Sequence, residues 1–191
     1  MRRQLLPAIL VFVALTLVCG VGYPAVVTAA AQIFHSKADG SLVKDPAGKV
    51  VGSSLLGQNF TEAKYFHPRP SAAGADGYDA TASAASNLGP NNTDLLATIA
   101  KRVTDYRTEN GLATDAKVPS DAVTASASGL DPEVSIDNAR LQAKRVADAR
   151  GIDLAAVESL IDAHTEGRSL GVLGDPGVNV LELNLALDAR A

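Results

Sequence analysis

The hydrophobic pattern of the chain begins with an unbroken apolar run near the N-terminus. Residues 5–31 contain no charged side chain, and Arg2 and Arg3 precede them. At ~1.5 Å per residue a helix of this length reaches roughly 40 Å, which exceeds the ~30 Å hydrocarbon core of a bilayer. The run therefore predicts a membrane-spanning helix, in which Pro24 is expected to cause a kink or to mark the exit from the bilayer.

The charges on either side of this run predict its orientation. Arg2 and Arg3 stand before it, whereas the nearest cations after it are balanced by Asp39. The positive-inside rule then places residues 1–4 in the cytoplasm and residues 35–191 outside, as one extracytoplasmic domain. We therefore expect a single-pass protein of the bacterial plasma (inner) membrane.

An export signal is the alternative interpretation of the N-terminus. Residues 29–31 are three alanines, which resemble a signal-peptide cleavage site, and Arg2-Arg3 is typical of twin-arginine signals. The apolar part, however, is nearly twice as long as the ~7–15 residues of a signal peptide. Its length favours an uncleaved anchor.

Beyond the span, the spacing of apolar positions predicts an α+β domain of helices packed on a small mixed sheet. Capping residues such as Asn92, Ser135 and Asp153 precede the helical patterns. The expected elements are a hairpin over residues 41–52, helices over 93–109, 136–150 and 154–166, and a strand over 178–187. The strand is predicted from leucines at every second position, and it is expected to join the early hairpin.

Two segments have no helical or alternating period. Residues 60–90 predict a long loop, and loops of this length in a compact domain are functional or disordered. Tyr65, Phe66 and Arg69 favour a functional loop, because disordered segments seldom concentrate aromatic residues. Residues 120–132 combine small hydroxyl side chains with glycine and Asp-Pro, which predicts a tight turn whose backbone can approach a partner.

Composition limits the classes of partner and site. All 21 acidic residues and 15 of the 17 basic ones follow the apolar run, so the remainder of the chain has a net charge of −6. An acidic balance argues against nucleic acid and anionic lipid as ligands. The single cysteine, Cys19, lies within the apolar run, which excludes an intrachain disulfide and a cysteine metal site.

No arrangement typical of an autonomous active site occurs in the sequence. His35, His67 and His164 stand in unrelated contexts, so no metal site is predicted. Ser126 and Ser128 lie beside a glycine but without the G-x-S-x-G elbow of a nucleophilic serine, and no phosphate-binding glycine loop is present. The chain is therefore expected to be a non-catalytic protein.

Several segments together resemble the C subunit of the bacterial Kdp-type potassium-transporting ATPase. They are residues 52–60 (GSSLLGQNF), 65–72 (YFHPRPSA), 86–90 (SNLGP), 123–132 (VTASASGLDP) and 178–188, with Gln142 ahead of Arg145-Val146-Ala147. The chain departs from the family's usual pattern at Ala127, where glycine is typical, and at Glu133, where histidine is typical.

The resemblance implies an accessory subunit of a high-affinity, ATP-driven potassium uptake pump that supports assembly and turnover. Its implied partners are an ATP-hydrolysing P-type subunit, a channel-like potassium-translocating subunit and a small single-span subunit. The family's C subunit is described as a catalytic chaperone to which ATP binding is attributed, and this implies Gln142 as a candidate nucleotide contact. An extracytoplasmic domain cannot meet cytoplasmic ATP, so a cap over the ion entrance is the physical alternative.

The same segments supply the residues that we expect to contact partners. These candidates are Tyr65, Phe66, Arg69, Ser71, Ser86, Asn87, Ser126, Ser128 and Asp131. A membrane-tethered extracytoplasmic sensor or solute-binding module is the alternative function, and it predicts a stable monomer with a small-molecule pocket.

Overall fold

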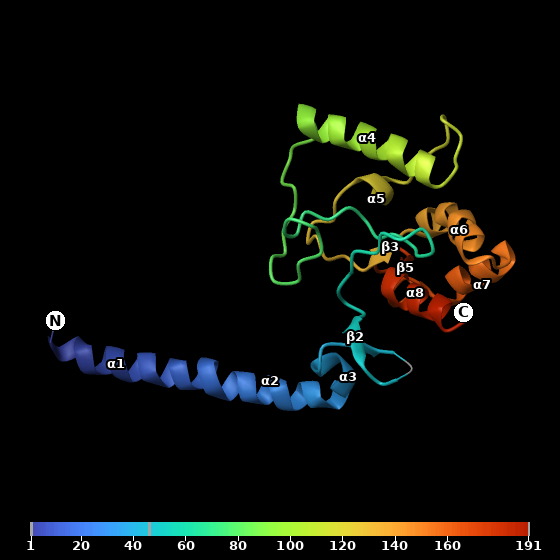
Figure 1. The fold of residues 1–191 in the computed structure, drawn as a ribbon. Coiled ribbons are helices and arrows are strands. Elements are labelled where there is room, and N and C mark those ends of the chain that lie inside the picture. The colour runs from blue at the N-terminus through green and yellow to red at the C-terminus, as the bar shows by residue number, and fades with distance from the viewer. Residues whose placement is uncertain (1, 46, 191) are drawn as a thin grey trace. The chain divides into compact units, whose positions relative to one another are not determined.

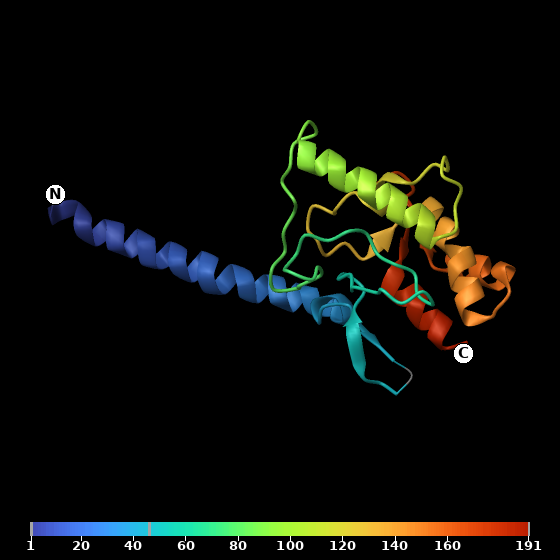
Figure 2. The same ribbon diagram turned by 45° about the horizontal axis from the view of Figure 1, so that its top comes forward.

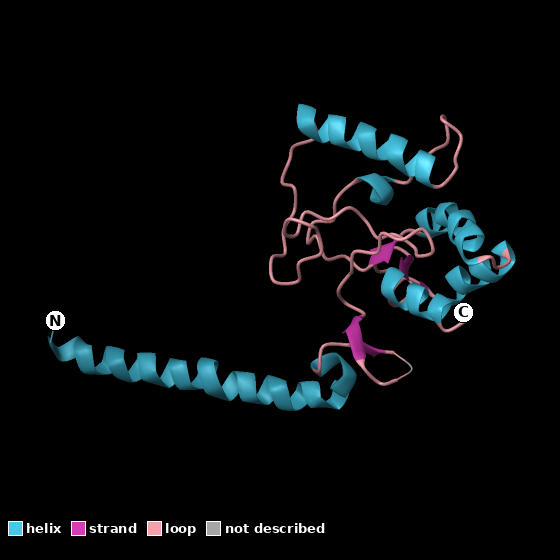
Figure 3. Cartoon of the chain, viewed as in Figure 1, coloured by secondary structure: helices cyan, strands magenta, loops and turns pink. Residues whose placement is uncertain are grey.

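The computed structural model describes residues 2–45 and 47–190 (Figure 1). Its internal contacts divide the chain into two compact units, Met1–Leu42 and Val43–Ala191. The first unit is helical, and the second combines helices with short strands (Figure 3). The predicted α+β class is confirmed.

The first unit contains one continuous apolar helix. Its segments are α1 (Arg2–Leu17), the π turn η1 (Val18–Gly22), α2 (Tyr23–Ala31), the 3₁₀ turn η2 (Gln32–Phe34) and α3 (His35–Ala38). Among the described residues, Arg3–Ala38 is the one helical stretch with the length and hydropathy to cross a membrane. None of that stretch is buried within the protein.

A π turn lies next to Pro24 and accommodates this proline within the helix. Pro24 has no N–H and lies in the first turn of α2, where the amide of Tyr23 bonds the carbonyl of Val18 instead of that of Cys19. Pro24 cannot donate a backbone hydrogen bond, and the wider π turn accommodates this. The helix therefore continues through the proline. It therefore does not end at Pro24.

The predicted hairpin is present, and its first strand begins at Leu42, the last residue of the first unit. Strands β1 (Leu42–Lys44) and β2 (Val50–Ser53) form a two-stranded sheet. Asp45 stabilises the turn: its carboxylate accepts a 2.9 Å bond from the amide of Lys49. Gly48 has a positive φ of 82°, which favours glycine.

Over the described residues 54–190 the structure has five helices, and three of them start at the predicted capping residues. They are α4 (Thr93–Glu109), α5 (Ser120–Val123), α6 (Ile136–Arg150), α7 (Leu154–Ala163) and α8 (Val180–Asp188). The side chains of Asn92, Ser135 and Asp153 cap α4, α6 and α7 through bonds to backbone amides. The predicted limits of α4 and α6 are confirmed, whereas α5 was not predicted and α7 is shorter than predicted.

The strand predicted over residues 178–187 is wrong. Only β5 (Gly177–Asn179) is extended, and α8 follows directly because the side chain of Asn179 accepts a 3.1 Å bond from the amide of Glu182. The buried positions Val180, Leu183, Asn184 and Leu187 recur at three or four residues, which is the helical period. The alternating leucines coincide with this stripe only in part.

A three-stranded sheet lies beside these helices, in the order β3-β5-β4. Strands β3 (Glu133–Val134) and β4 (Thr165–Glu166) both pair antiparallel with β5. This sheet is therefore antiparallel, whereas a mixed sheet was predicted. The C-terminal strand therefore does not join the hairpin as expected. Figure 2 shows α6, α7 and α8 grouped near this sheet, with α4 at the margin of the unit.

The hydrophobic core is formed by α6, α7, α8 and the sheet, together with one residue of the long loop. Its buried members are Phe66, Val134, Ala139, Ala143, Val146, Ala147, Val157, Leu160, Ile161, Val178, Val180, Leu183 and Leu187. The loop residue, Phe66, has an exposed fraction of 0%. Phe60, at the start of the loop, also packs against the core but is only partly buried. The core thus anchors the beginning of the long loop through these two aromatic side chains.

Candidate functional site

The long loop carries six of the residues predicted to contact partners, and it is the framework of the candidate site. Residues 60–90, all of which the structure describes, contain no helix or strand, as predicted. Peptide groups in such a segment need partners other than a backbone ladder. Side chains from the helices supply them.

Two buried carboxamides hold consecutive residues of the loop. Asn184 accepts a 2.8 Å bond from the amide of Phe66 and donates a 3.0 Å bond to its carbonyl. Gln142 does the same for His67, with distances of 2.7 and 3.1 Å. Both side chains lie in the core with 1% exposure. We call this pair the amide clamp, because each amide group binds a loop residue as a neighbouring strand would.

The amide clamp uses the full hydrogen-bonding capacity of Gln142. Its oxygen also accepts a 2.8 Å bond from Arg145, and its nitrogen donates a 2.9 Å bond to Asn138. With two bonds accepted and two donated, the amide has no free position. A nucleotide contact at Gln142 would have to displace one of these bonds, and this contact stays a prediction.

Arg145 fixes the start of the loop from the same helix. Its Nη1 donates to the carbonyls of Ala63 and Tyr65, at 2.6 and 2.9 Å, and its Nε donates to Asn110 at 3.0 Å. Burial lowers the pKa of this guanidinium. Arg145 therefore connects α6, the end of α4 and the loop.

A second polar cluster joins α4, α5 and α6. The carboxylate of Asp121 accepts bonds from the amide and hydroxyl of Ser135 and from the side chain of Asn138, at 2.8 to 3.0 Å. Tyr106 donates a 2.8 Å bond to Asn138, and burial raises the pKa of this phenol. Because Asn138 also contacts Gln142, the cluster supports the amide clamp.

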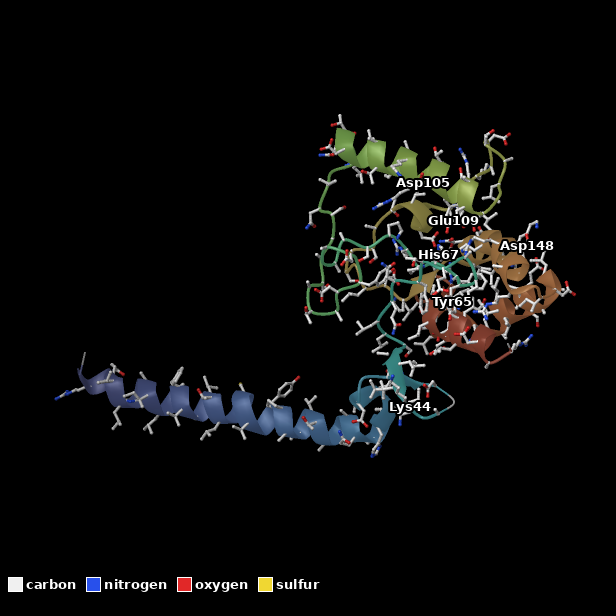
Figure 4. All side chains as sticks on the ribbon, viewed as in Figure 1. Lys44, Tyr65, His67, Asp105, Glu109 and Asp148 are labelled. Atoms are coloured by element: carbon white, nitrogen blue, oxygen red, sulfur yellow. The ribbon has the colours of Figure 1, made fainter. Side chains whose placement is uncertain are left out.

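A groove of about 440 Å³ separates the loop from α4. His67 and Glu109 line it and lie close together in Figure 4, and Nδ1 of the imidazole is 2.7 Å from the carboxylate. The hydrogen bond from His67 lowers the pKa of Glu109, although partial burial acts in the opposite direction. Within the part of the chain that the structure describes, no three histidine, cysteine or acidic residues gather as metal ligands would.

The structure brings several predicted contact residues together. Arg69 pairs with Asp131 at 2.6 Å, and Ser71 donates a 2.6 Å bond to the carbonyl of Gly129. These contacts attach the loop to the 120–132 turn, in which Gly129 has a φ of 68° and no room for a Cβ atom. Tyr65 instead bonds Asp188 at the end of α8, at 2.9 Å.

Two predicted contact residues lie apart from this group. Ser86 and Asn87 are exposed, and the amide of Asn87 bonds only the nearby carbonyl of Ala85, at 3.2 Å. Neither residue lines the groove.

A second concave surface, of about 530 Å³, lies at the 120–132 turn. We call it the Ser126 hollow. It is lined by Leu55, Leu56, Arg69, Ser126, Ala127, Ser128, Leu130, Asp131 and Pro132. Four of these, Arg69, Ser126, Ser128 and Asp131, are predicted contact residues.

Other residues of the site were missed by the sequence analysis. Asn184 lies in the segment predicted as a strand, and Asp121 belongs to a helix that was not predicted. No local signal identifies the buried Asn184 or the partly buried Asp121 as an acceptor, because their partners lie elsewhere along the chain.

Comparison with known proteins gives matches over nearly the whole chain. A family model described as "K+-transporting ATPase, c chain" matches residues 5–189. The potassium-transporting ATPase KdpC subunit of Mycobacterium tuberculosis (strain H37Rv) is 58% identical over 189 residues, which cover 98% of this chain and 99% of the relative. Proteins of the same name from Gemmatimonas aurantiaca and Caulobacter vibrioides are each 52% identical, over 99% and 100% of this chain and 94% and 95% of the relatives.

The amide clamp can be tested by replacing Asn184 with alanine. The variant leaves the buried N–H and C=O of Phe66 without partners, so we expect a loss of roughly 2–5 kcal/mol in the free energy of unfolding. Asn87→Ala, at an exposed position of the same loop, should change it by about 0.5 kcal/mol or less. Denaturant unfolding of the full chain in detergent measures both, and limited proteolysis within residues 60–90 should increase only for Asn184→Ala.

The contact between His67 and Glu109 predicts a pH dependence of stability. Because the folded-state pKa of Glu109 lies below its ordinary value of 4.5, its contribution is present above that value and is lost as the pH falls through the folded pKa. Glu109→Gln should therefore flatten the acid limb of a plot of melting temperature against pH. Glu158→Gln, at an exposed position on α7, should leave that limb unchanged. Equal curves for wild type and Glu109→Gln would contradict the prediction.

Proposed function

Because this chain belongs to the KdpC family, the c chain of potassium-transporting ATPases, we propose that it supports the assembly and turnover of an ATP-driven potassium uptake pump. The observation that carries the proposal is the family match over residues 5–189. Its partners in the pump would be an ATP-hydrolysing P-type subunit, a channel-like potassium-translocating subunit and a small single-span subunit. The chain itself would be a non-catalytic subunit.

The second unit would act as a cap over the ion entrance of the potassium-translocating subunit. Its acidic balance, −6 after the apolar run, would raise the local concentration of cations. The saturated amide of Gln142 supports this role better than a direct role in binding ATP, because no hydrogen-bonding position is left for a nucleotide. ATP would then be used by the ATPase subunit.

A cap of this kind requires a defined topology. The helix Arg3–Ala38 would cross the plasma membrane once, with residues 1–4 in the cytoplasm and residues 35–191 outside. The two arginines ahead of the helix support this orientation.

The tethered solute-binding module is the second candidate, and the groove between the loop and α4 favours it. At about 440 Å³ the groove is within the usual range for small-molecule sites. This candidate predicts a chain that is complete without other subunits.

Removal of residues 35–191 distinguishes the two candidates. If the chain is a pump subunit, the truncated form should fail to recover potassium-stimulated ATP hydrolysis, because the contacts that complete the complex are lost. The measurement is ATPase activity and subunit content after purification of the pump in mild detergent through a tag on the ATPase subunit. Normal transport with the truncated chain would contradict the proposal, and a full-length chain that elutes alone as a monomer would favour the module.

The orientation can be tested by cysteine labelling in a Cys19→Ala background. Thr114→Cys, at an exposed position of the second unit, should react with a membrane-impermeant maleimide in intact spheroplasts. Gln4→Cys, ahead of the apolar run, is the matched control and should react only after the membrane is opened. The reverse labelling pattern would place the second unit in the cytoplasm and would restore direct ATP binding as the better role.

A further inference from the structure

Two buried side-chain atoms lack a hydrogen-bond partner within the described residues, and both belong to the Ser126 hollow. They are the Nε of Arg69 and the hydroxyl of Ser126. Ser126 is only 3% exposed. Buried polar groups are nearly always paired, so two unpaired atoms lining one hollow suggest that their partner comes from outside the chain.

A backbone hydrogen bond joins the segments that carry these two residues. The amide of Ser126 donates a 3.3 Å bond to the carbonyl of Pro70, the residue after Arg69. Arg69 uses its Nη1 to pair with Asp131 at 2.6 Å, and this leaves its Nε available. Two of the residues that line the hollow therefore each carry an unpaired hydrogen-bond donor.

The charge of the hollow favours a neutral acceptor. Asp131 balances the guanidinium of Arg69 directly, and both residues line the hollow. An anionic ligand such as phosphate would meet this carboxylate as well as the two donors. A backbone carbonyl accepts hydrogen bonds without bringing a charge.

The remaining lining of the hollow is apolar. Leu55 and Leu56 are 62% and 37% exposed, and a 2.9 Å bond from the amide of Gly57 to the carbonyl of Leu130 holds them beside the turn. Pro132 completes this part of the lining. An aliphatic side chain of a partner would bury both leucines away from water. A water molecule bound in the hollow would leave them hydrated.

We propose that the Ser126 hollow docks a main-chain segment of another subunit of the pump. In this interface an aliphatic side chain of the partner packs on Leu55 and Leu56, and an adjacent carbonyl accepts hydrogen bonds from Ser126 and Arg69. The inference rests on the proposed function, because it takes the partner from the pump complex.

A photo-crosslinking amino acid at Leu55 tests the proposal in the assembled pump. We expect a crosslink to another pump subunit, identified by mass spectrometry of the crosslinked peptides. The same amino acid at Leu96, which is 54% exposed on α4, is the matched control and should not give that product. A crosslink to lipid, a crosslink to a second copy of this chain, or no crosslink at Leu55 would overturn the proposal.

Substitution of Ser126 separates docking from a bound water molecule. Ser126→Ala should not lower the melting temperature of the isolated full-length chain, because no bond within the chain is lost. It should weaken association with the pump by roughly three- to tenfold, which corresponds to one hydrogen bond. Ser159→Ala, at an exposed position on α7, should change neither quantity.

The opposite result is also defined. If Ser126→Ala lowers the melting temperature of the isolated chain and leaves association unchanged, the hydroxyl is paired with buried water and the proposal fails. Loss of activity on truncation together with no crosslink from Leu55 would reject the hollow and leave the proposed function standing.

Discussion

The second unit depends on two carboxamides that bind the backbone of its longest loop. Thirty-one residues without a helix or strand, residues 60–90, would otherwise expose their peptide groups to water or bury them unpaired. Asn184 and Gln142 substitute for a neighbouring strand at Phe66 and His67, and Phe66 enters the core between them. The amide clamp fixes the loop at Phe66 and His67, and the rest of the loop follows from there. The groove and the Ser126 hollow therefore both depend on the amide clamp.

Around the amide clamp, polar side chains connect elements that share little hydrophobic contact. None of the residues of α4 is buried, yet Tyr106 and Asn110 attach this helix to Asn138 and Arg145 of α6. Hydrogen bonds of this kind need defined distances and angles, whereas apolar contacts tolerate sliding. The helix is therefore fixed in direction although its apolar stripe is only partly covered.

The sequence predicted the parts of the fold that local chemistry controls. Asn92 and Ser135 start α4 and α6 where expected, and Gly151 ends α6 with a φ of 66°. The C-terminal segment was misread, because leucines at every second position imitate a strand and the cap at Asn179 outweighs them. In the site, Arg69 and Asp131 were both identified as contact residues, but their pairing across 62 positions was not. Such a pairing depends on the tertiary fold and leaves no periodic pattern.

The order in which the chain is synthesised determines when the amide clamp can form. The loop leaves the ribosome well before the two residues that hold it, since 118 positions separate Phe66 from Asn184. Until Asn184 has been synthesised, the peptide group of Phe66 has no buried partner, although the apolar helix that precedes it is already complete. The newly made protein must therefore pass through a stage in which its apolar helix is formed while its longest loop is not yet held in place.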